Sequence, residues 1–209
     1  MFIRRICKEF KTFKNEIKCK VKLKTWHSCA TFVGEGQRCK PDSNIVLRQS
    51  SKENVILHEH CEVFGTIISF KKGVVVMKEW SKIGPGTVIN CVNRVEIGKD
   101  TAIANNVLII DNNTHPTNPE DRRYMRHTPH NSDERQPWHS DSAPIIIGEN
   151  VWIGSNARIC KGVTIGDNSI IAANSVLTKS VPANSVAAGN PARVVKEGID
   201  KATTPIFPL

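Results

Sequence analysis

Aliphatic residues return at every sixth position through the C-terminal part of the chain. They are Ile147, Ile153, Ile159, Ile165, Ile171 and Leu177. The residue after each one is mostly small, and the fifth residue of each hexad is small or β-branched, as at Val151 and Ala157. A period of six fits neither a 3.6-residue helix nor a simple alternating strand. It predicts a solenoid of short strands joined by sharp turns, in which stacked coils bury the recurring aliphatic side chains.

The same frame continues upstream at Ile97, Ile103 and Ile109, and more weakly between Leu57 and Val63. We therefore predict an all-β domain over residues 55–196. Within it, residues 182–196 leave the period and are expected to cap the array. Residues 25–54 are predicted to be a lead-in segment and residues 197–209 a tail. The alternative is a sandwich of unrelated amphipathic strands.

The repeat region resembles a known family of enzymes. Residues 147–196 begin IGENVWIGSNARICKGVTIGDN and end AAGNPARVVK. This segment resembles the hexapeptide-repeat acyltransferases, above all the sugar O-acetyltransferases of the galactoside, maltose and surface-polysaccharide types. The resemblance implies a left-handed parallel β-helix with three strands per coil. It also implies acetyl-CoA as co-substrate, a sugar or glycan acceptor, and a homotrimer with active sites at subunit interfaces.

The repeat is interrupted after Ile109 and resumes at Ile147. Residues 115–144 are polar, with five prolines and four of the seven histidines, and are predicted to form one long inserted loop beside the active site. In the family, a histidine just after a coil is the catalytic base, and the resemblance assigns this role to His115. A neutral imidazole can accept the proton of a hydroxyl that attacks a thioester. The alternative is an exposed loop histidine.

Several other residues are candidates for the acceptor side of the site. Asp111 could orient His115, and Asn90 could reach the acceptor, although both also suit corners of coils. In the loop, Trp138 could stack on a sugar, and Arg122, Arg123 and His139 could line a pocket for an acidic acceptor. The roles of His127 and His130 are left open. A loop whose composition is incidental is the alternative.

The resemblance also places a donor groove. It implies that Trp152 and Ser155 lie near the thioester and that Ala173 contacts the pantetheine arm. Toward the nucleotide end it places Thr178, Lys179, Arg193 and Lys196, and the last three could pair with phosphates. The alternatives are that Trp152 covers a coil and that Arg193 caps the solenoid.

The N-terminal segment has a different pattern. Apolar residues at spacings of three and four predict a basic amphipathic helix over residues 1–24. This helix could shield the open end of the first coil or lie on an anionic membrane surface. The two interpretations are compatible.

Charge and composition narrow the function classes. The formal net charge is +9, but residues 1–24 contain nine Lys or Arg and two acids, so the remaining chain is nearly neutral. This distribution argues against a nucleic-acid-binding protein. The seven cysteines form no C-x-x-C pair, and no apolar run is long enough to span a membrane. We expect free thiols and a cytoplasmic protein, peripheral at the inner membrane face if the helix binds lipid.

The leading hypothesis is a CoA-dependent O-acetyltransferase acting on a sugar hydroxyl. An N-acetyltransferase of an amino sugar and a non-catalytic β-helix scaffold are the alternatives. A zinc-dependent β-helical carbonic anhydrase would need three histidines on one metal. Only His58 and His60 could share a strand face, so no metal is expected. The sequence leaves the acceptor sugar and the acylated atom open.

Overall fold

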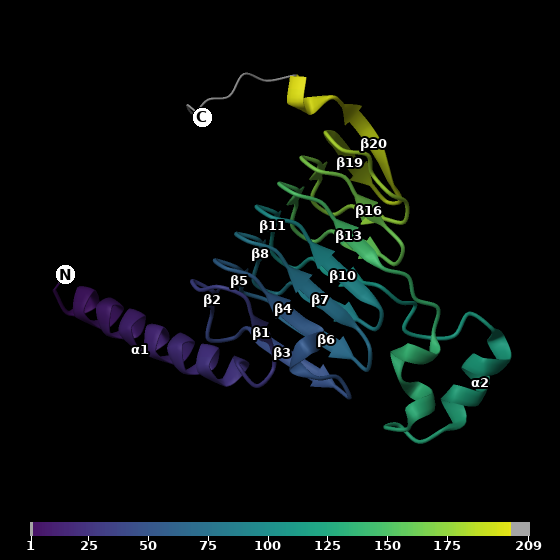
Figure 1. Ribbon diagram of the computed structural model, residues 1–209, viewed down its shortest axis with the longest axis horizontal. Coiled ribbons are helices and arrows are strands. Elements are labelled where there is room, and N and C mark those ends of the chain that lie inside the picture. The colour runs from purple at the N-terminus through teal and green to yellow at the C-terminus, as the bar shows by residue number, and fades with distance from the viewer. Residues whose placement is uncertain (1, 202–209) are drawn as a thin grey trace.

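The chain forms three parallel β-sheets that wind around one core (Figure 1). The computed structural model describes residues 2–201, with side chains from Thr12 onward. Successive strands pass from the first sheet to the second and then to the third, so three strands make one coil. This architecture confirms the predicted parallel β-helix solenoid.

The three sheets contain six, eight and six strands. The first sheet contains β1 (Thr31–Phe32), β4 (Val55–Leu57), β7 (Val74–Met77), β10 (Arg94–Ile97), β13 (Ile145–Ile147) and β16 (Thr164–Ile165). The second contains β2 (Arg38–Cys39), β5 (Glu62–Val63), β8 (Lys82–Ile83), β11 (Ala102–Ile103), β14 (Trp152–Ile153), β17 (Ile170–Ile171), β19 (Ser185–Gly189) and β20 (Ala192–Glu197). The third contains β3 (Asn44–Arg48), β6 (Thr66–Phe70), β9 (Val88–Cys91), β12 (Leu108–Ile110), β15 (Arg158–Cys160) and β18 (Val176–Leu177).

The aliphatic residues of the repeat form the core. Ile109, Ile147, Ile153 and Ile159 are all buried. The strand register stacks equivalent positions directly, as in the pairing of Ile109 with Ile159. Burying each such side chain contributes about 1.5–3 kcal/mol relative to exposure, and the burial depends on the neighbouring coils.

Asparagines make many of the corners between sheets. Asn150, Asn168 and Asn184 have φ angles of 51°, 58° and 55° between the first and second sheets. Asparagine tolerates this left-handed conformation better than most residues. The side-chain amide of Asn150 donates to Oδ1 of Asn168 at 3.0 Å, and that of Asn168 donates to Asn184 at 3.0 Å. The repeated conformation keeps the coils in register.

The solenoid begins one coil earlier than the sequence pattern indicated. β1, β2 and β3 pair in parallel with β4, β5 and β6, so residues 31–48 of the predicted lead-in segment are a complete coil. Its inward side chains include the buried Cys39 and Ile45, which are also six residues apart. The aliphatic pattern did not predict this coil, because Cys39 occupies an inward position that is aliphatic in the later coils. A short 3-10 helix, η1 (Lys52–Asn54), leads from this coil to the next.

The two ends of the solenoid differ. At the C-terminal end, β20 pairs antiparallel with β19 and closes the second sheet, followed by a 3-10 turn, η4 (Ile199–Lys201), within the predicted tail. At the other end lies α1 (Phe2–Trp26), which confirms the predicted helix. Its C-terminal part packs on the first coil, and its axis leads away from the body of the solenoid toward the N-terminus (Figure 1). No helix among residues 2–201 has an apolar stretch that could cross a bilayer.

Candidate active site

The insertion leaves the solenoid at the edge between the third and first sheets. It starts at the end of β12 and returns at the start of β13. A bridge between Asn112 and Ser142 joins its two ends, and the N–H of Ala143 donates to the carbonyl of Asp111 at 2.9 Å. The insertion is therefore closed at its root, and the coils on either side stack without a gap, with Ile97 paired to Ile147.

The sequence predicted one long loop here, but the insertion also contains helices. It contains α2 (Pro119–His127) and two 3-10 helices, η2 (Asp133–Arg135) and η3 (Pro137–His139). Asn118 caps α2 by accepting the N–H of Glu120 at 2.8 Å, and Pro119 occupies the first turn. Asparagine followed by proline and two acids is an ordinary helix start. The signal was present in the sequence.

Asp111 is buried beneath the root of the insertion. Its carboxylate accepts hydrogen bonds from the N–H groups of Val92 at 2.9 Å and Asn93 at 2.8 Å, and from the thiol S–H of Cys91 at 3.2 Å. Burial raises the pKa of the Cys91 thiol, and the neighbouring carboxylate raises it further. Among the described residues, no hydrogen bond joins Asp111 to the ring of His115. The carboxylate of Asp111 instead holds the corner of a coil. A corner residue was the alternative to a residue that orients the His115 ring.

Asn112 connects this corner to His115. Its Nδ2 donates to Oδ1 of Asp111 at 3.0 Å and to Oδ1 of Asn90 at 3.2 Å, while its Oδ1 accepts the N–H of Thr114 at 2.9 Å. Thr114 has a φ of 62°, an uncommon conformation for a β-branched residue. The amide of Asn112 therefore fixes the strained residue directly before His115. Sequence analysis identified Asn90 but missed Asn112.

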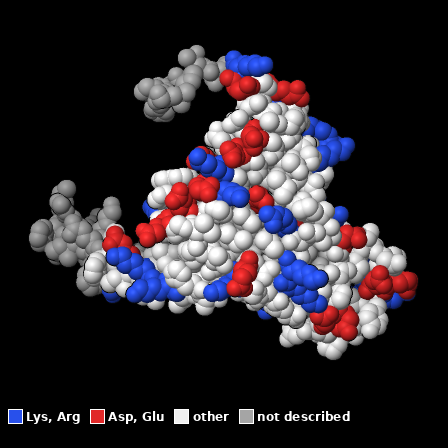
Figure 2. Space-filling view, viewed as in Figure 1, with Lys and Arg blue, Asp and Glu red and all other residues white. Residues whose placement is uncertain are grey.

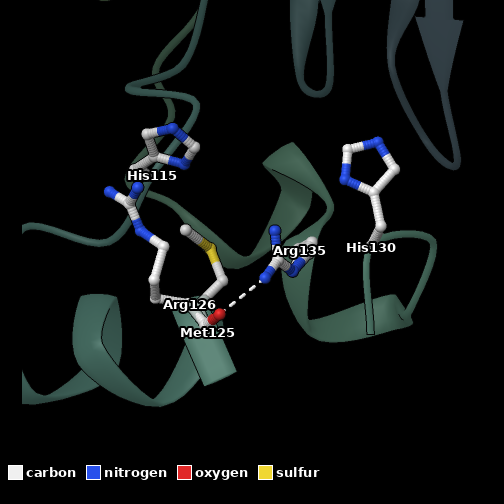
Figure 3. Close-up of a pocket in the computed structure, with 5 residues that line it drawn as sticks. All are labelled: His115, Met125, Arg126, His130 and Arg135. Atoms are coloured by element: carbon white, nitrogen blue, oxygen red, sulfur yellow. Dashed lines mark hydrogen bonds between the residues drawn. The ribbon is translucent and has the colours of Figure 1, made fainter. Parts of the chain in front are cut away.

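His115 is exposed and lines a cavity of about 280 Å³ under α2. The other lining residues are Met125, Arg126, His130 and Arg135 (Figure 3). Nη2 of Arg135 donates to the carbonyl of Arg126 at 2.6 Å, so Arg135 braces the end of α2. The Arg126 side chain points toward His115 in Figure 3, and its guanidinium has no hydrogen bond or ion pair to any described residue. The cavity thus brings together a candidate base, His115, and the guanidinium of Arg126, which has no partner among the described residues.

The two arginines predicted for the acceptor pocket do not line this cavity. Arg122 turns back and donates to the carbonyls of Pro116 and Thr117, which supports the segment after His115. Arg123 is exposed and pairs with Glu120 at 3.0 Å. Arg122 and Arg126 are four residues apart and share one face of α2, so the hydrogen bonds of Arg122 to Pro116 and Thr117 account for the difference. The side chain of Arg126, in contrast, points into the cavity (Figure 3).

Trp138 attaches the insertion to the solenoid, whereas His139 pairs within the insertion. The Trp138 ring lies beside that of Phe70, with centroids 6.2 Å apart, and Nζ of Lys71 lies 4.0 Å from its centre. Nε2 of His139 lies 2.7 Å from Oδ2 of Asp133. His139 also lines a second cavity of about 260 Å³ beside Met125, and His115 lies outside that cavity. Within one chain, neither predicted residue shares the His115 cavity.

The predicted donor residues lie on two different parts of the solenoid. Trp152 is exposed on the second sheet, and Ser155 and Ala173 lie in the turns after β14 and β17. Arg193 and Lys196 are exposed on β20 of the same sheet. Thr178 and Lys179 instead follow β18, at the edge from which the insertion leaves. A single chain therefore does not assemble the whole set around His115.

No group of three or more His, Cys, Asp or Glu side chains within residues 12–201 could hold a metal ion. Nδ1 of His58 lies 2.8 Å from Oε1 of Glu79, and His60 stacks on Trp80 with ring centroids 4.0 Å apart. These two histidines therefore have other partners.

Residues 144–179 match the family model described as bacterial transferase hexapeptide, six repeats. This segment is a hexapeptide repeat. With the three parallel sheets, this match and the similar solved structures identify the fold as a left-handed β-helix.

Two curated relatives that this chain is similar to come from Escherichia coli K12. The galactoside O-acetyltransferase is 60% identical over 60 residues, which cover 29% of this chain and 30% of the relative. WbbJ, named as an O-acetyl transferase of lipopolysaccharide biosynthesis, is 33% identical over 139 residues, which cover 62% of this chain and 63% of the relative. The matches thus span less than two thirds of either relative.

Two solved structures are similar over more of the chain. The polySia-specific acetyltransferase NeuO has a TM-score of 0.60 at 26% identity, covering 81% of this chain and 83% of NeuO. A galactoside acetyltransferase in complex with coenzyme A has a TM-score of 0.51 at 28% identity, covering 85% of this chain and 70% of that structure.

Proposed function

We propose that this protein is an acetyl-CoA-dependent O-acetyltransferase of a sugar hydroxyl, with His115 as general base. The observation that carries the proposal is the placement of His115. The ring stands at the end of a coil, at a cavity, on a backbone fixed by Asn112. The named activities of the similar proteins support the same chemistry.

The reaction needs one proton acceptor and no covalent enzyme intermediate. A ring nitrogen of His115 accepts the proton of the acceptor hydroxyl while its oxygen attacks the thioester carbonyl carbon. The carbon–sulfur bond breaks, and the CoA sulfur leaves with the electron pair. The proton then passes from the imidazolium to the thiolate, so the products are the acetyl ester and free CoA.

The donor residues support a homotrimer. Trp152, Arg193 and Lys196 lie on the second sheet, whereas His115 and Lys179 lie at the edge between the third and first sheets. Contact between the second sheet of one subunit and that edge of its neighbour would bring the two sets together. The exposed cations among them suit the phosphates of CoA.

Arg126 narrows the acceptor class. Its free guanidinium beside His115 suits an acceptor with a carboxylate or a phosphate near the reacting hydroxyl. NeuO, which is specific for polySia by its name, is one of the similar structures. We infer an acidic sugar or glycan as acceptor.

The test measures thiol release from acetyl-CoA with a panel of neutral, acidic and amino sugars. We expect turnover with an acidic sugar, and a loss of roughly 10²–10⁴-fold in kcat for His115→Ala. His127→Ala is the matched control, because His127 also belongs to the insertion but does not line the His115 cavity. Unchanged turnover in His115→Ala would remove His115 as base. A product stable to mild alkali would be an amide and would indicate N-acetylation.

A further inference from the structure

One face of α1 carries exposed apolar side chains. Phe13, Ile17 and Val21 are 59%, 47% and 55% exposed. Residues four apart lie almost in line along a helix, so these three form one stripe. Stripes of large exposed apolar side chains mark interaction surfaces.

The opposite face of α1 already has a partner. Leu23 and the buried Trp26 pack on the core of the solenoid. Nζ of Lys22 donates to the carbonyl of Pro41 at 2.7 Å, and Sγ of Cys39 lies 3.6 Å from the carbonyl oxygen of Cys19. At 100° per residue, these positions lie roughly opposite Ile17. The contact with the solenoid therefore fixes the stripe on the outer side of the helix.

Lysines flank the apolar stripe. Lys18 lies on one side of it and Lys20 on the other, while Lys24 lies in line with the stripe at its C-terminal end, and all three are exposed. Lys and Arg side chains gather on this part of α1 in Figure 2. Within residues 1–24 the charges sum to +7, from nine basic and two acidic residues. The surface thus combines apolar side chains with a strong positive charge.

The sequence continues the stripe toward the N-terminus. Ile3, Ile6 and Phe10 have the spacing that leads to Phe13, and the helical backbone runs unbroken from Phe2. The side chains of residues 2–11 lie outside the described part. α1 has 25 residues and is roughly 37 Å long, so it is long enough to lie along a bilayer surface. Its described residues are too polar to cross the bilayer.

We propose that α1 binds in the plane of an anionic lipid surface, with Phe13, Ile17 and Val21 at the acyl boundary and the lysines at lipid phosphates. A second copy of the chain is the competing occupant. Pairing two such helices through the stripe would bring two segments of charge +7 together, and it would place Lys24 in the contact between them. The charge therefore favours lipid.

Flotation with vesicles tests the proposal on the full chain. We expect binding to vesicles of phosphatidylcholine with phosphatidylglycerol, and weak binding to phosphatidylcholine alone. Combining Phe13→Ser, Ile17→Ser and Val21→Ser should lower the partition coefficient at least tenfold. Replacing Lys18 and Lys20 by Gln should lower it about fivefold per lysine, and only with the anionic vesicles.

A matched variant and a second measurement separate the outcomes. Asn15→Ser combined with Glu16→Gln changes exposed polar residues of the same helix and should bind vesicles at least as well as the wild type. Circular dichroism should show an intact solenoid in every variant, because the altered side chains are exposed. Equal binding of the triple variant and the wild type would overturn the proposal. The wild type could instead fail to float with the vesicles and sediment as an oligomer that the triple variant does not form. That result would overturn the proposal and assign the apolar stripe to a contact with a second copy of the chain. Neither result depends on the enzymatic proposal.

Discussion

Nδ2 of Asn112 lies 3.2 Å from Oδ1 of Asn90 and links the root of the insertion to the neighbouring strand of the third sheet. The same amide contacts Asp111 and the N–H of Thr114. A rigid coil thereby sets the position of His115 through one nearly buried side chain. In this arrangement Asn112 is a positioning residue rather than a group that touches substrate.

Asn112→Ala should lower kcat roughly 10–100-fold with little change in KM for acetyl-CoA, because the residue before His115 loses its anchor. The free energy of unfolding should fall by about 1–3 kcal/mol through the unpaired polar groups. Steady-state kinetics and denaturant unfolding measure the two effects. Asn113→Ala is the control, because Asn113 is exposed and its side-chain contacts are long, at 3.4 Å. Wild-type kcat in Asn112→Ala would refute the positioning role.

Arg126→Ala should raise KM for an acidic acceptor roughly 10–100-fold and leave KM for acetyl-CoA unchanged. The reason is the loss of charge-assisted hydrogen bonds to the acceptor, worth about 1.5–3 kcal/mol. Arg123→Ala is the matched control on the same helix, since Arg123 pairs only with Glu120 among the described residues. Equal effects of the two substitutions would contradict a specific role for Arg126.

Asp111→Ala should destabilise the fold by about 3 kcal/mol. It removes the acceptor of two buried N–H groups, those of Val92 and Asn93, and leaves both unpaired. Denaturant unfolding with a constant m-value is the appropriate measurement. Asp42→Ala replaces an exposed aspartate and should stay within about 0.5 kcal/mol of wild type. A similarly small effect at position 111 would show that the corner does not need the carboxylate.

Acid should loosen the insertion. The hydrogen bond from His139, and then the charge of Lys71, hold the pKa of Asp133 below its ordinary value. A lowered carboxyl pKa stabilises the folded arrangement above about pH 4, and this contribution is lost as the pH falls through the lowered value. The indole N–H signal of Trp138 in NMR spectra should therefore shift as the pH falls below about 4.

Asp133→Asn should shift the Trp138 signal already at pH 7, because the Lys71 and His139 pairs are lost. Glu134→Gln is the control in the same 3-10 helix, because Glu134 makes no ion pair with Lys71. An identical pH dependence in wild type and Asp133→Asn would show that packing on Phe70 alone holds the insertion.

The sequence by itself determined the solenoid, because its information is local and repeated. Every sixth residue from Ile147 to Leu177 must find the same inner environment, and stacking of adjacent coils supplies it. The break in the six-residue repeat after Ile109 predicted the position of the insertion. The amphipathic period of the N-terminal segment predicted α1. The start of α2 at Asn118 and Pro119 was equally local and could have been predicted from the same kind of signal.

Only the tertiary structure decided which side chains meet around His115. Arg126 and Arg135 line its cavity, whereas Arg122 supports Pro116 and Thr117, and Trp138 packs on Phe70, more than sixty residues away in sequence. Likewise, the sequence predicted the stripe on α1, but its exposure depends on how Trp26 and Leu23 dock on the first coil. These contacts do not repeat and join distant segments. They depend on the direction in which each helix and turn presents its side chains, which the repeat pattern does not encode.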